Sequence, residues 1–219
     1  MTYDIIEIVQ NFIVLFTAIT VHEYAHGYVA HRLGDPTAKA MGRLTLNPLA
    51  HLDPLGALMM IFCRFGWAKP VPVNPYYFKD AKKGMVAVSI AGPLANLLLA
   101  FIAFTVYPIF LVIIAKTGVS FNGAVLQFII QLFIACGTLN VCFAVFNLIP
   151  FPPLDGSKIL FAFLPGDIYN TILTYERYGT IALLFLSVTG VLSRVLSIVI
   201  DPILYAYSLW MNFLINILM

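Results

Sequence analysis

Long apolar runs, separated by short polar or proline-containing stretches, make up most of this chain. The first run covers residues 5–33, and the others cover residues 84–115, 123–149, 178–200 and 202–219. A helix of about 20 apolar residues is long enough to cross the hydrocarbon core of a bilayer. The pattern therefore predicts an all-α, multi-pass membrane protein with about five transmembrane helices.

Glycine and proline mark the ends of these runs. Gly34 and Pro36 end the first run, and Pro202 separates the last two. The stretch "AGPLAN" interrupts the second run, where Pro93 predicts a kink and the small residues allow a neighbouring helix to approach closely. The prolines of "NLIPFPPLDG" end the third run, because they forbid regular helix.

Residues 34–83 show a different pattern. "GRLTLNP" alternates apolar and polar residues as a short strand does, and "PVPVNPYYF" suits an edge strand because of its prolines. Between them, "LGALMMIFCRFGW" is apolar but too short to cross a bilayer, which predicts a re-entrant segment. We therefore expect a small cytoplasmic β-element and a re-entrant segment between the first two helices.

The basic residues predict how the helices are oriented. Eight of the 12 Lys and Arg residues lie within residues 32–83, and short loops rich in Lys and Arg stay in the cytoplasm. We expect a cell-membrane protein with its N-terminus outside and its C-terminus in the cytoplasm. On this topology the end of the first helix and the "PPLDG" stretch lie at one depth, toward the cytoplasmic side.

Composition supports a membrane protein and argues against other classes. The chain is 61% hydrophobic and 10% charged, whereas a soluble domain carries about 25% charged residues. A net charge of +2 without a long basic run gives no reason to expect nucleic-acid binding. The three cysteines have no C-x-x-C spacing, so we expect buried thiols. The N-terminus has no basic region and no small-residue cleavage site, so no removable signal peptide is expected.

The segment "HEYAH" places polar chemistry inside the first apolar run. Ionisable side chains are costly at membrane depth and need partners. His22 and His26 leave one face of a helix, at a spacing that lets both bind one Zn²⁺. Glu23 lies beside that face and can act as general base on a metal-bound water. The alternative is an interhelical hydrogen-bond cluster without metal, in which Glu23 would need its own partner.

A catalytic zinc also needs a third protein ligand. Asp155 in "PPLDG" is the best candidate, because it follows broken backbone at the same depth and Gly156 allows a tight turn beside it. The alternative role for Asp155 is to cap the helix that follows.

Other polar residues fit structural roles at least as well. His51 and Asp53 lie in the predicted cytoplasmic loop, where turn formation and capping explain them. His31 points away from the face of the two motif histidines and is interpreted as an interfacial polar residue. Asn147 stands where the third helix breaks, so its amide can bind either the freed backbone or the backbone of a substrate.

The chain resembles the site-2 proteases, a family of intramembrane zinc metalloproteases. The resemblance rests on "HEYAHG" in one hydrophobic segment, "NLIPFPPLDG" at the end of another, and "AGPLAN" between them. "GRLTLNPLAHLDPLG" is similar to the compact prokaryotic branch. The resemblance covers residues 15–160, and we expect no PDZ-like insertion between the core segments and no C-terminal regulatory domain.

The resemblance implies a role for each motif residue. It implies His22, His26 and Asp155 as ligands of one zinc ion, Glu23 as catalytic base, and Asn147 as a residue that holds the substrate or the transition state. It also implies a small sheet after the first motif helix, to which an extended substrate adds.

We therefore expect an enzyme, a metalloendopeptidase that cuts peptide bonds within or near transmembrane helices of membrane-protein substrates in the bilayer. A helical substrate must unwind first, because its own hydrogen bonds shield the peptide bond, and pairing with an edge strand would stabilise the unwound form. One polytopic domain is expected over residues 1–219, with a catalytic core at 5–160 and accessory helices at 178–219. The alternatives are a membrane metal-binding or transport protein and an inactive scaffold, and the presence of Glu23 argues against both.

Overall fold

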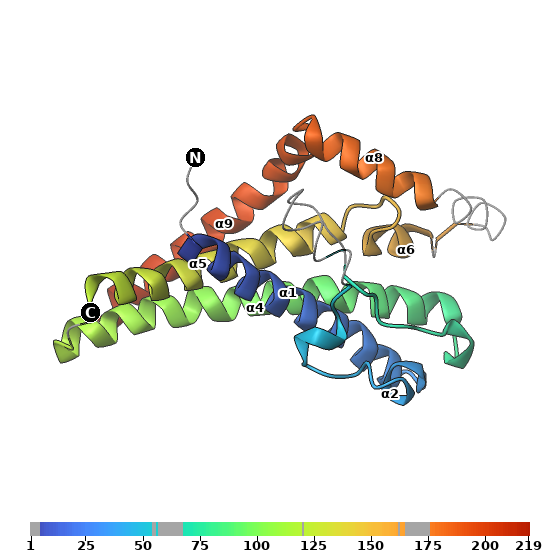
Figure 1. Cartoon of the computed structure of the whole chain (residues 1–219), viewed down its shortest axis with the longest axis horizontal. Helices are drawn as coiled ribbons and strands as arrows, with labels where there is room; N and C mark the ends of the chain where they lie inside the picture. The colour runs from blue at the N-terminus through green and yellow to red at the C-terminus, as the bar shows by residue number, and fades with distance from the viewer. Residues whose placement is uncertain (1–4, 54–55, 57–67, 120, 162, 165–175) are drawn as a thin grey trace.

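The computed structural model describes residues 5–53, 56, 68–119, 121–161, 163–164 and 176–219, and these residues are predominantly helical (Figure 1). The elements in chain order are α1 (Ile5–Arg32), α2 (Thr37–Ala40), η1 (Pro48–Ala50), η2 (Pro75–Tyr77), α4 (Ala81–Thr117), α5 (Gly123–Asn147), α6 (Asp155–Phe161), α8 (Glu176–Val188) and α9 (Val191–Leu218). The predicted all-α class is confirmed. The predicted end of the first helix is also confirmed, since α1 stops at Arg32 and Gly34 adopts a positive φ of 106°.

Helix α4 is the element on which the others pack. It contacts α1, α5, α6 and α9, and Figure 1 shows it running along the length of the molecule beside α5. An apolar cluster fills the space between α4, α5 and α9, and its buried members are Ala100, Phe104, Val141, Val145 and Ile200. Helices α4 and α5 approach closely at Gly137, where a Cβ atom would lie 2.4 Å from the ring of Phe104.

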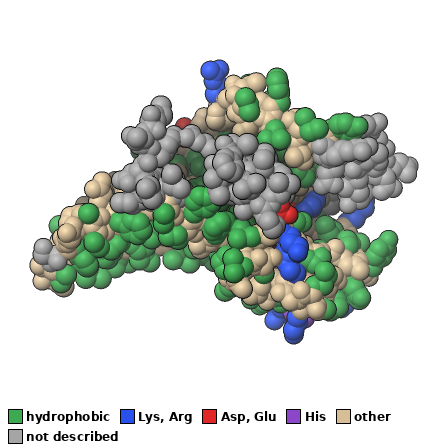
Figure 2. Space-filling model, in the orientation of Figure 1, with side chains coloured by type: hydrophobic (Ala, Val, Ile, Leu, Met, Phe, Trp, Pro, Cys, Tyr) green, Lys and Arg blue, Asp and Glu red, His purple; other side chains and the backbone are tan. Residues whose placement is uncertain are grey.

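Three of the described helices are long and apolar enough to cross a membrane, namely α4, α5 and α9. Large hydrophobic side chains remain exposed on them, such as Leu98, Phe101 and Ile113 on α4. Figure 2 shows hydrophobic side chains over the end of the molecule that α4 and α5 form, whereas Lys and Arg gather over the other half. These features are those of a membrane protein, although the expected count of about five spans is not confirmed.

The boundary between the last two helices was predicted at the wrong place. We expected it at Pro202, but α8 ends at Val188 and α9 runs unbroken from Val191 through Pro202. Gly190 makes the turn with a φ of 72°, which glycine adopts without steric cost. Ile200 and Ile203, on either side of Pro202, both pack on the α4–α5 cluster, and this packing keeps the two halves of α9 in one helix. With 13 residues, α8 is too short to cross a bilayer.

The predicted interruption of the second run is also absent. Helix α4 continues through Pro93, which is fully buried. The expected close approach at this site is real, because a Cβ atom on Gly92 would lie 2.5 Å from Nε2 of His26 and 2.6 Å from Cε1 of His22. Packing against α1 therefore supports the helix where proline removes a backbone hydrogen bond.

The two predicted strands do not form in the described residues. "GRLTLNP" consists of turns and bends that lead into η1, and "PVPVNPYYF" is extended before it enters η2. The β-bridge found among the described residues joins Leu52 to Ala68. Prolines remove N–H donors from the extended segment, and carboxylates accept two that remain, as described below. The predicted re-entrant segment lies mostly outside the described residues.

Candidate metal centre

The two motif histidines of α1 point toward α4 and α6. His22 and His26 stand one turn apart on α1, and both are buried, with 3% and 7% of their surface exposed. Gly92 of α4 lets that helix approach the imidazoles, as its missing side chain leaves room for them. The four-residue spacing of the two histidines therefore places both imidazoles on the same side of α1.

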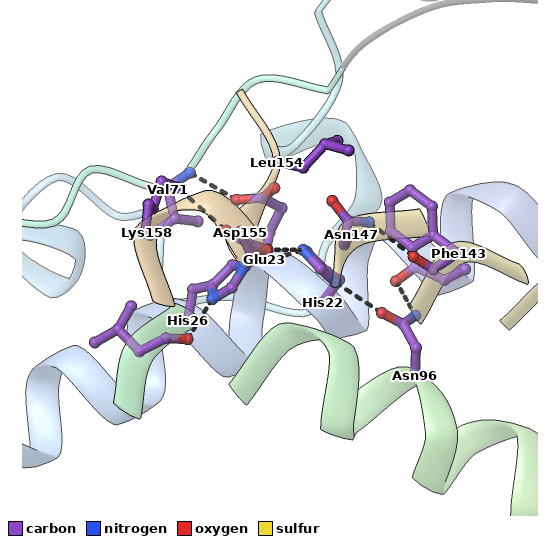
Figure 3. Close-up of polar contacts among 12 residues, drawn as sticks. His22, Glu23, His26, Val71, Asn96, Phe143, Asn147, Leu154, Asp155 and Lys158 are labelled. Carbon is purple, nitrogen blue, oxygen red and sulfur yellow. Dashed lines mark hydrogen bonds and ion pairs between the residues drawn. The ribbon is translucent and has the colours of Figure 1, made fainter. Parts of the chain in front are cut away.

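Asp155 reaches the histidines from another part of the chain. It is the first residue of α6, and the proline-rich turn after α5 brings it back over α1 (Figure 3). Gly156 makes this turn possible, because a Cβ atom there would lie 2.2 Å from the carbonyl oxygen of Leu148. Oδ2 of Asp155 lies 3.0 Å from Nε2 of His22 and 3.0 Å from Nε2 of His26.

The hydrogen-bond partners indicate which imidazole nitrogens are free. Nδ1 of His26 lies 2.7 Å from the carbonyl oxygen of Val88, and a carbonyl can only accept, so Nδ1 carries the proton. Nδ1 of His22 lies 2.7 Å from Oδ1 of Asn96. In both rings this leaves the lone pair of Nε2 directed at Asp155.

These tautomers make the three atoms a site for a cation. The two Nε2 atoms lie only 2.9 Å apart, and each lies 3.0 Å from a carboxylate oxygen, so three acceptors meet at one point. A single proton can remove the repulsion between acceptors in one of the three contacts, whereas a metal ion bound by all three atoms removes it in all of them. Two imidazole nitrogens and a carboxylate oxygen are a ligand set that zinc accepts. The residues that could hold such an ion are His22, His26 and Asp155.

Glu23 lies beside this cluster on the wall of the same cavity. The cavity has a volume of about 340 Å³ and is also lined by Val71, Val73, Asn147 and Lys158. Oε2 of Glu23 accepts a hydrogen bond of 2.7 Å from the backbone N–H of Val71 (Figure 3). The N–H of Val71 is thus the hydrogen-bond partner that a carboxylate at this depth needs, and the Glu23 carboxylate still lines the cavity.

Asn147 is the last residue of α5, and its side chain is nearly buried. Its Nδ2 donates to the carbonyl oxygen of Phe143 at 2.9 Å, which is the backbone use considered from the sequence. The residue also lines the cavity, so the second N–H of its amide is not committed to Phe143.

The contacts of the Asp155 side chain are not those of a helix cap. Its oxygens lie against the two histidines and against Nζ of Lys158, which donates to Oδ1 at 3.1 Å. The sequence analysis missed Lys158, although its spacing of three residues from Asp155 places both on one helix face. The oxygen that faces the histidines is therefore Oδ2, while Lys158 binds the other.

The remaining candidates lie elsewhere. His51 is fully buried, with its Nε2 at 2.8 Å from the carbonyl oxygen of Thr45, and Asp53 accepts from the N–H of Gly56 at 2.8 Å. Both have the turn roles expected of them. His31 lies in the last turn of α1 and is not part of the histidine–aspartate cluster. Cys136 and Cys142 are free thiols, as expected, but they are half-buried and not buried, and Cys63 lies outside the described residues.

Sequence comparisons agree with this geometry. Residues 10–188 match Peptidase family M50. The chain is 44% identical over 184 residues to "Putative zinc metalloprotease YwhC" of Bacillus subtilis, which covers 84% of this chain and 82% of that protein. It is 28% identical over 186 residues to "Putative zinc metalloprotease Rip2" of Mycolicibacterium smegmatis, which covers 81% and 66%.

A more distant relative is "Zinc metalloprotease MJ0392" of Methanocaldococcus jannaschii, which is 29% identical over 153 residues, or 70% of this chain and 34% of that protein. No solved structure gives a significant match. Zinc is the metal that these relatives are named for. Because the family match spans most of the chain, this protein belongs to peptidase family M50, the site-2 type of zinc metalloendopeptidase.

Proposed function

We propose that this protein cuts peptide bonds within or near transmembrane helices of membrane-protein substrates, with zinc held by His22, His26 and Asp155. The observation that carries the proposal is the meeting of two Nε2 lone pairs and one carboxylate oxygen, 2.9–3.0 Å apart, on the wall of a cavity. A zinc ion bound there would polarise the scissile carbonyl and lower the pKa of its water.

Glu23 is the proposed general base. Its carboxylate lies on the cavity wall next to the ligands, and the N–H of Val71 fixes one of its oxygens. The carboxylate takes a proton from the attacking water and passes it to the leaving amine. Asn147 is proposed to bind a substrate carbonyl through the N–H that does not bond to Phe143.

The extended segment of residues 69–74 is the proposed docking edge for the unwound substrate. Val71 and Val73 from this segment line the cavity, close to Glu23. An extended peptide that pairs with this backbone loses its own helical hydrogen bonds in the same step, which exposes its carbonyl to the ligands. Prolines at positions 70 and 72 leave the edge with few donors of its own, so pairing would use chiefly its carbonyl oxygens.

We further propose the expected placement of residues 34–83 in the cytoplasm and of the N-terminus outside, with the cavity reached by water from the cytoplasmic side. The exposed apolar surfaces of α4, α5 and α9 and the basic loop support this placement. Labelling of Tyr76→Cys provides a test, because this residue is 95% exposed. In sealed cells an impermeant thiol reagent should leave it unmodified, and modification from outside would reverse the topology.

The function is tested with purified protein in liposomes and tagged single-span membrane proteins whose helices contain glycine or proline. Wild-type protein should cut at least one of them in a zinc-dependent way, and cleavage should map within or beside the span. A protein that binds zinc but cuts none of a broad panel would favour the metal-binding or transport alternative. His22→Ala serves as the control for loss of the metal.

A further inference from the structure

Two buried amides lie next to the metal centre but do not line the cavity. Asn96 of α4 and Asn140 of α5 both have no exposed surface. Amide groups in such apolar helices are costly unless their hydrogen bonds are satisfied. Figure 3 shows Asn96 on the ribbon of α4, below and to the right of His22 and joined to it by a hydrogen bond. Their contacts therefore need an explanation beyond packing.

The two amides form a chain of hydrogen bonds that ends at His22. Nδ2 of Asn140 donates to the carbonyl oxygen of Cys136 at 2.8 Å. Nδ2 of Asn96 donates to Oδ1 of Asn140 at 2.7 Å and to the carbonyl oxygen of Ala18 at 3.0 Å. Oδ1 of Asn96 lies 2.7 Å from Nδ1 of His22. The chain thus connects α5, α4 and α1.

This chain can run in only one direction. The carbonyl oxygens of Cys136 and Ala18 only accept, so each must face an amide N–H. Rotating either asparagine by 180° about its amide would bring oxygen against a carbonyl oxygen. Oδ1 of Asn96 must therefore face His22, and it accepts the proton of Nδ1. The lone pair of Nε2 is then directed at Oδ2 of Asp155, 3.0 Å away.

We propose that Asn96 is a positioning residue that fixes the tautomer and ring orientation of His22, and that Asn140 fixes Asn96. The proposal deepens the metal site proposed above and rests on it for its effect on zinc. The proposed tautomer of His22 does not depend on the metal site, because it is a property of the metal-free protein. Second-sphere partners of this kind typically change metal affinity by about 10–100-fold.

The first experiment measures the tautomer without metal. Protein labelled with ¹⁵N in its four histidines is studied by NMR after zinc removal, with His22→Ala identifying the signal of His22. Wild-type His22 should carry its proton on Nδ1, and Asn96→Leu should shift it toward the Nε2–H form. A wild-type Nε2–H tautomer, or no change in Asn96→Leu, would overturn the proposal.

The second experiment measures zinc affinity by competition with a chelator. Asn96→Leu should bind zinc about 10–100-fold more weakly than wild type, and Asn140→Leu should show a smaller loss in the same direction. Gln10→Leu is the matched control, because Gln10 is also a buried amide, donates to the carbonyl oxygen of Phe128 and does not line the cavity. Equal losses in Gln10→Leu and Asn96→Leu would show a general effect of amide burial and overturn the proposal.

Each failure has a separate signature. If Asn96→Leu does not fold, Asn140→Leu tests the same chain, since it leaves Oδ1 of Asn96 in place and removes one of the two acceptors that orient its amide. If His22→Ala still binds zinc at wild-type affinity, the proposed ligand set fails, while the NMR result still decides the tautomer.

Discussion

The two sides of helix α4 serve different purposes. Toward α1 it presents Gly92 and Asn96, which lie against the metal-centre histidines. Toward α5 and α9 it presents Ala100 and Phe104, which belong to a purely apolar cluster. On the side facing α1, a substitution must keep the buried hydrogen bonds satisfied. On the side facing α9, a substitution must keep the volume of the packed side chains. Variants on the two sides should therefore separate chemistry from stability.

The largest effect is expected for Asp155→Asn on the chemical side. Removing the negative ligand should lower zinc affinity by more than about 100-fold and abolish cleavage, because the change is in the proposed ligand set itself. Elemental analysis after dialysis against a weak chelator measures the metal, with His22→Ala as reference. Asparagine caps helices about as well as aspartate, so full zinc occupancy with normal cleavage would return Asp155 to a capping role.

Glu23→Gln should separate the base from the metal. The glutamine keeps the shape of the side chain and can still accept from the N–H of Val71, so zinc content should equal that of wild type. Cleavage should fall by at least about 100-fold, since the proton acceptor is gone. Zinc content and cleavage are measured on one preparation. Activity close to wild type would remove Glu23 from the proposed role.

On the apolar side, Phe104→Ala should reduce stability and spare the metal. Phe104 packs over Gly137 and against the ring of Tyr207, with centroids 5.0 Å apart, and its loss should cost about 3 kcal/mol of unfolding free energy. Denaturant unfolding in detergent measures the loss, and chelator competition measures zinc affinity, which should stay within about a factor of two. A large drop in zinc affinity would mean that the two sides of α4 are coupled.

The smallest effect is expected in the loop after α1, where pH is the variable. Burial alone would raise the pKa of Asp35, but hydrogen bonds from the N–H groups of Asn74 and Thr37 hold this pKa below its ordinary value. A depressed pKa stabilises the fold above the unfolded-state pKa of about 3.9, and this stabilisation is lost as pH falls through the folded-state pKa.

Asp35→Asn should therefore cost about 2 kcal/mol near neutral pH, and the gap to wild type should narrow in acid. Unfolding is followed across the pH range with Asp80→Asn as the control, because Asp80 caps α4 at an exposed position. A constant gap at all pH values would show that the carboxylate charge of Asp35 is not what the fold uses.

Much of the candidate site was predictable because ionisable residues are rare in an apolar chain and are easily recognised there. The spacing of His22 and His26, and the depth shared with Asp155, led to a cluster that the structure brings together. The fold class followed from hydropathy for the same reason. The described helices that are long and apolar enough to span are α4, α5 and α9, whereas α8 has only 13 residues.

What the sequence could not predict depends on packing between distant segments. Asn96 stood within a quoted motif, but only its small neighbours were interpreted, and nothing local indicates that its amide would reach His22 across 74 positions. Likewise, no local rule says that contacts on both sides of Pro202 would outweigh its helix-breaking tendency. In the second expected strand, "PVPVNPYYF", Glu23 and Asp35 accept the N–H groups of Val71 and Asn74, which a partner strand would otherwise use.

The bond between His26 and Val88 has a consequence for how this centre can change by mutation. The acceptor is the carbonyl oxygen of the main chain, so no codon change at position 88 that preserves the helix can delete it. His22 depends instead on a side chain, which a single substitution can replace. A single substitution can therefore remove the acceptor of the Nδ1 proton from only one of the two imidazoles, and tuning of the metal toward other ions should begin at position 96.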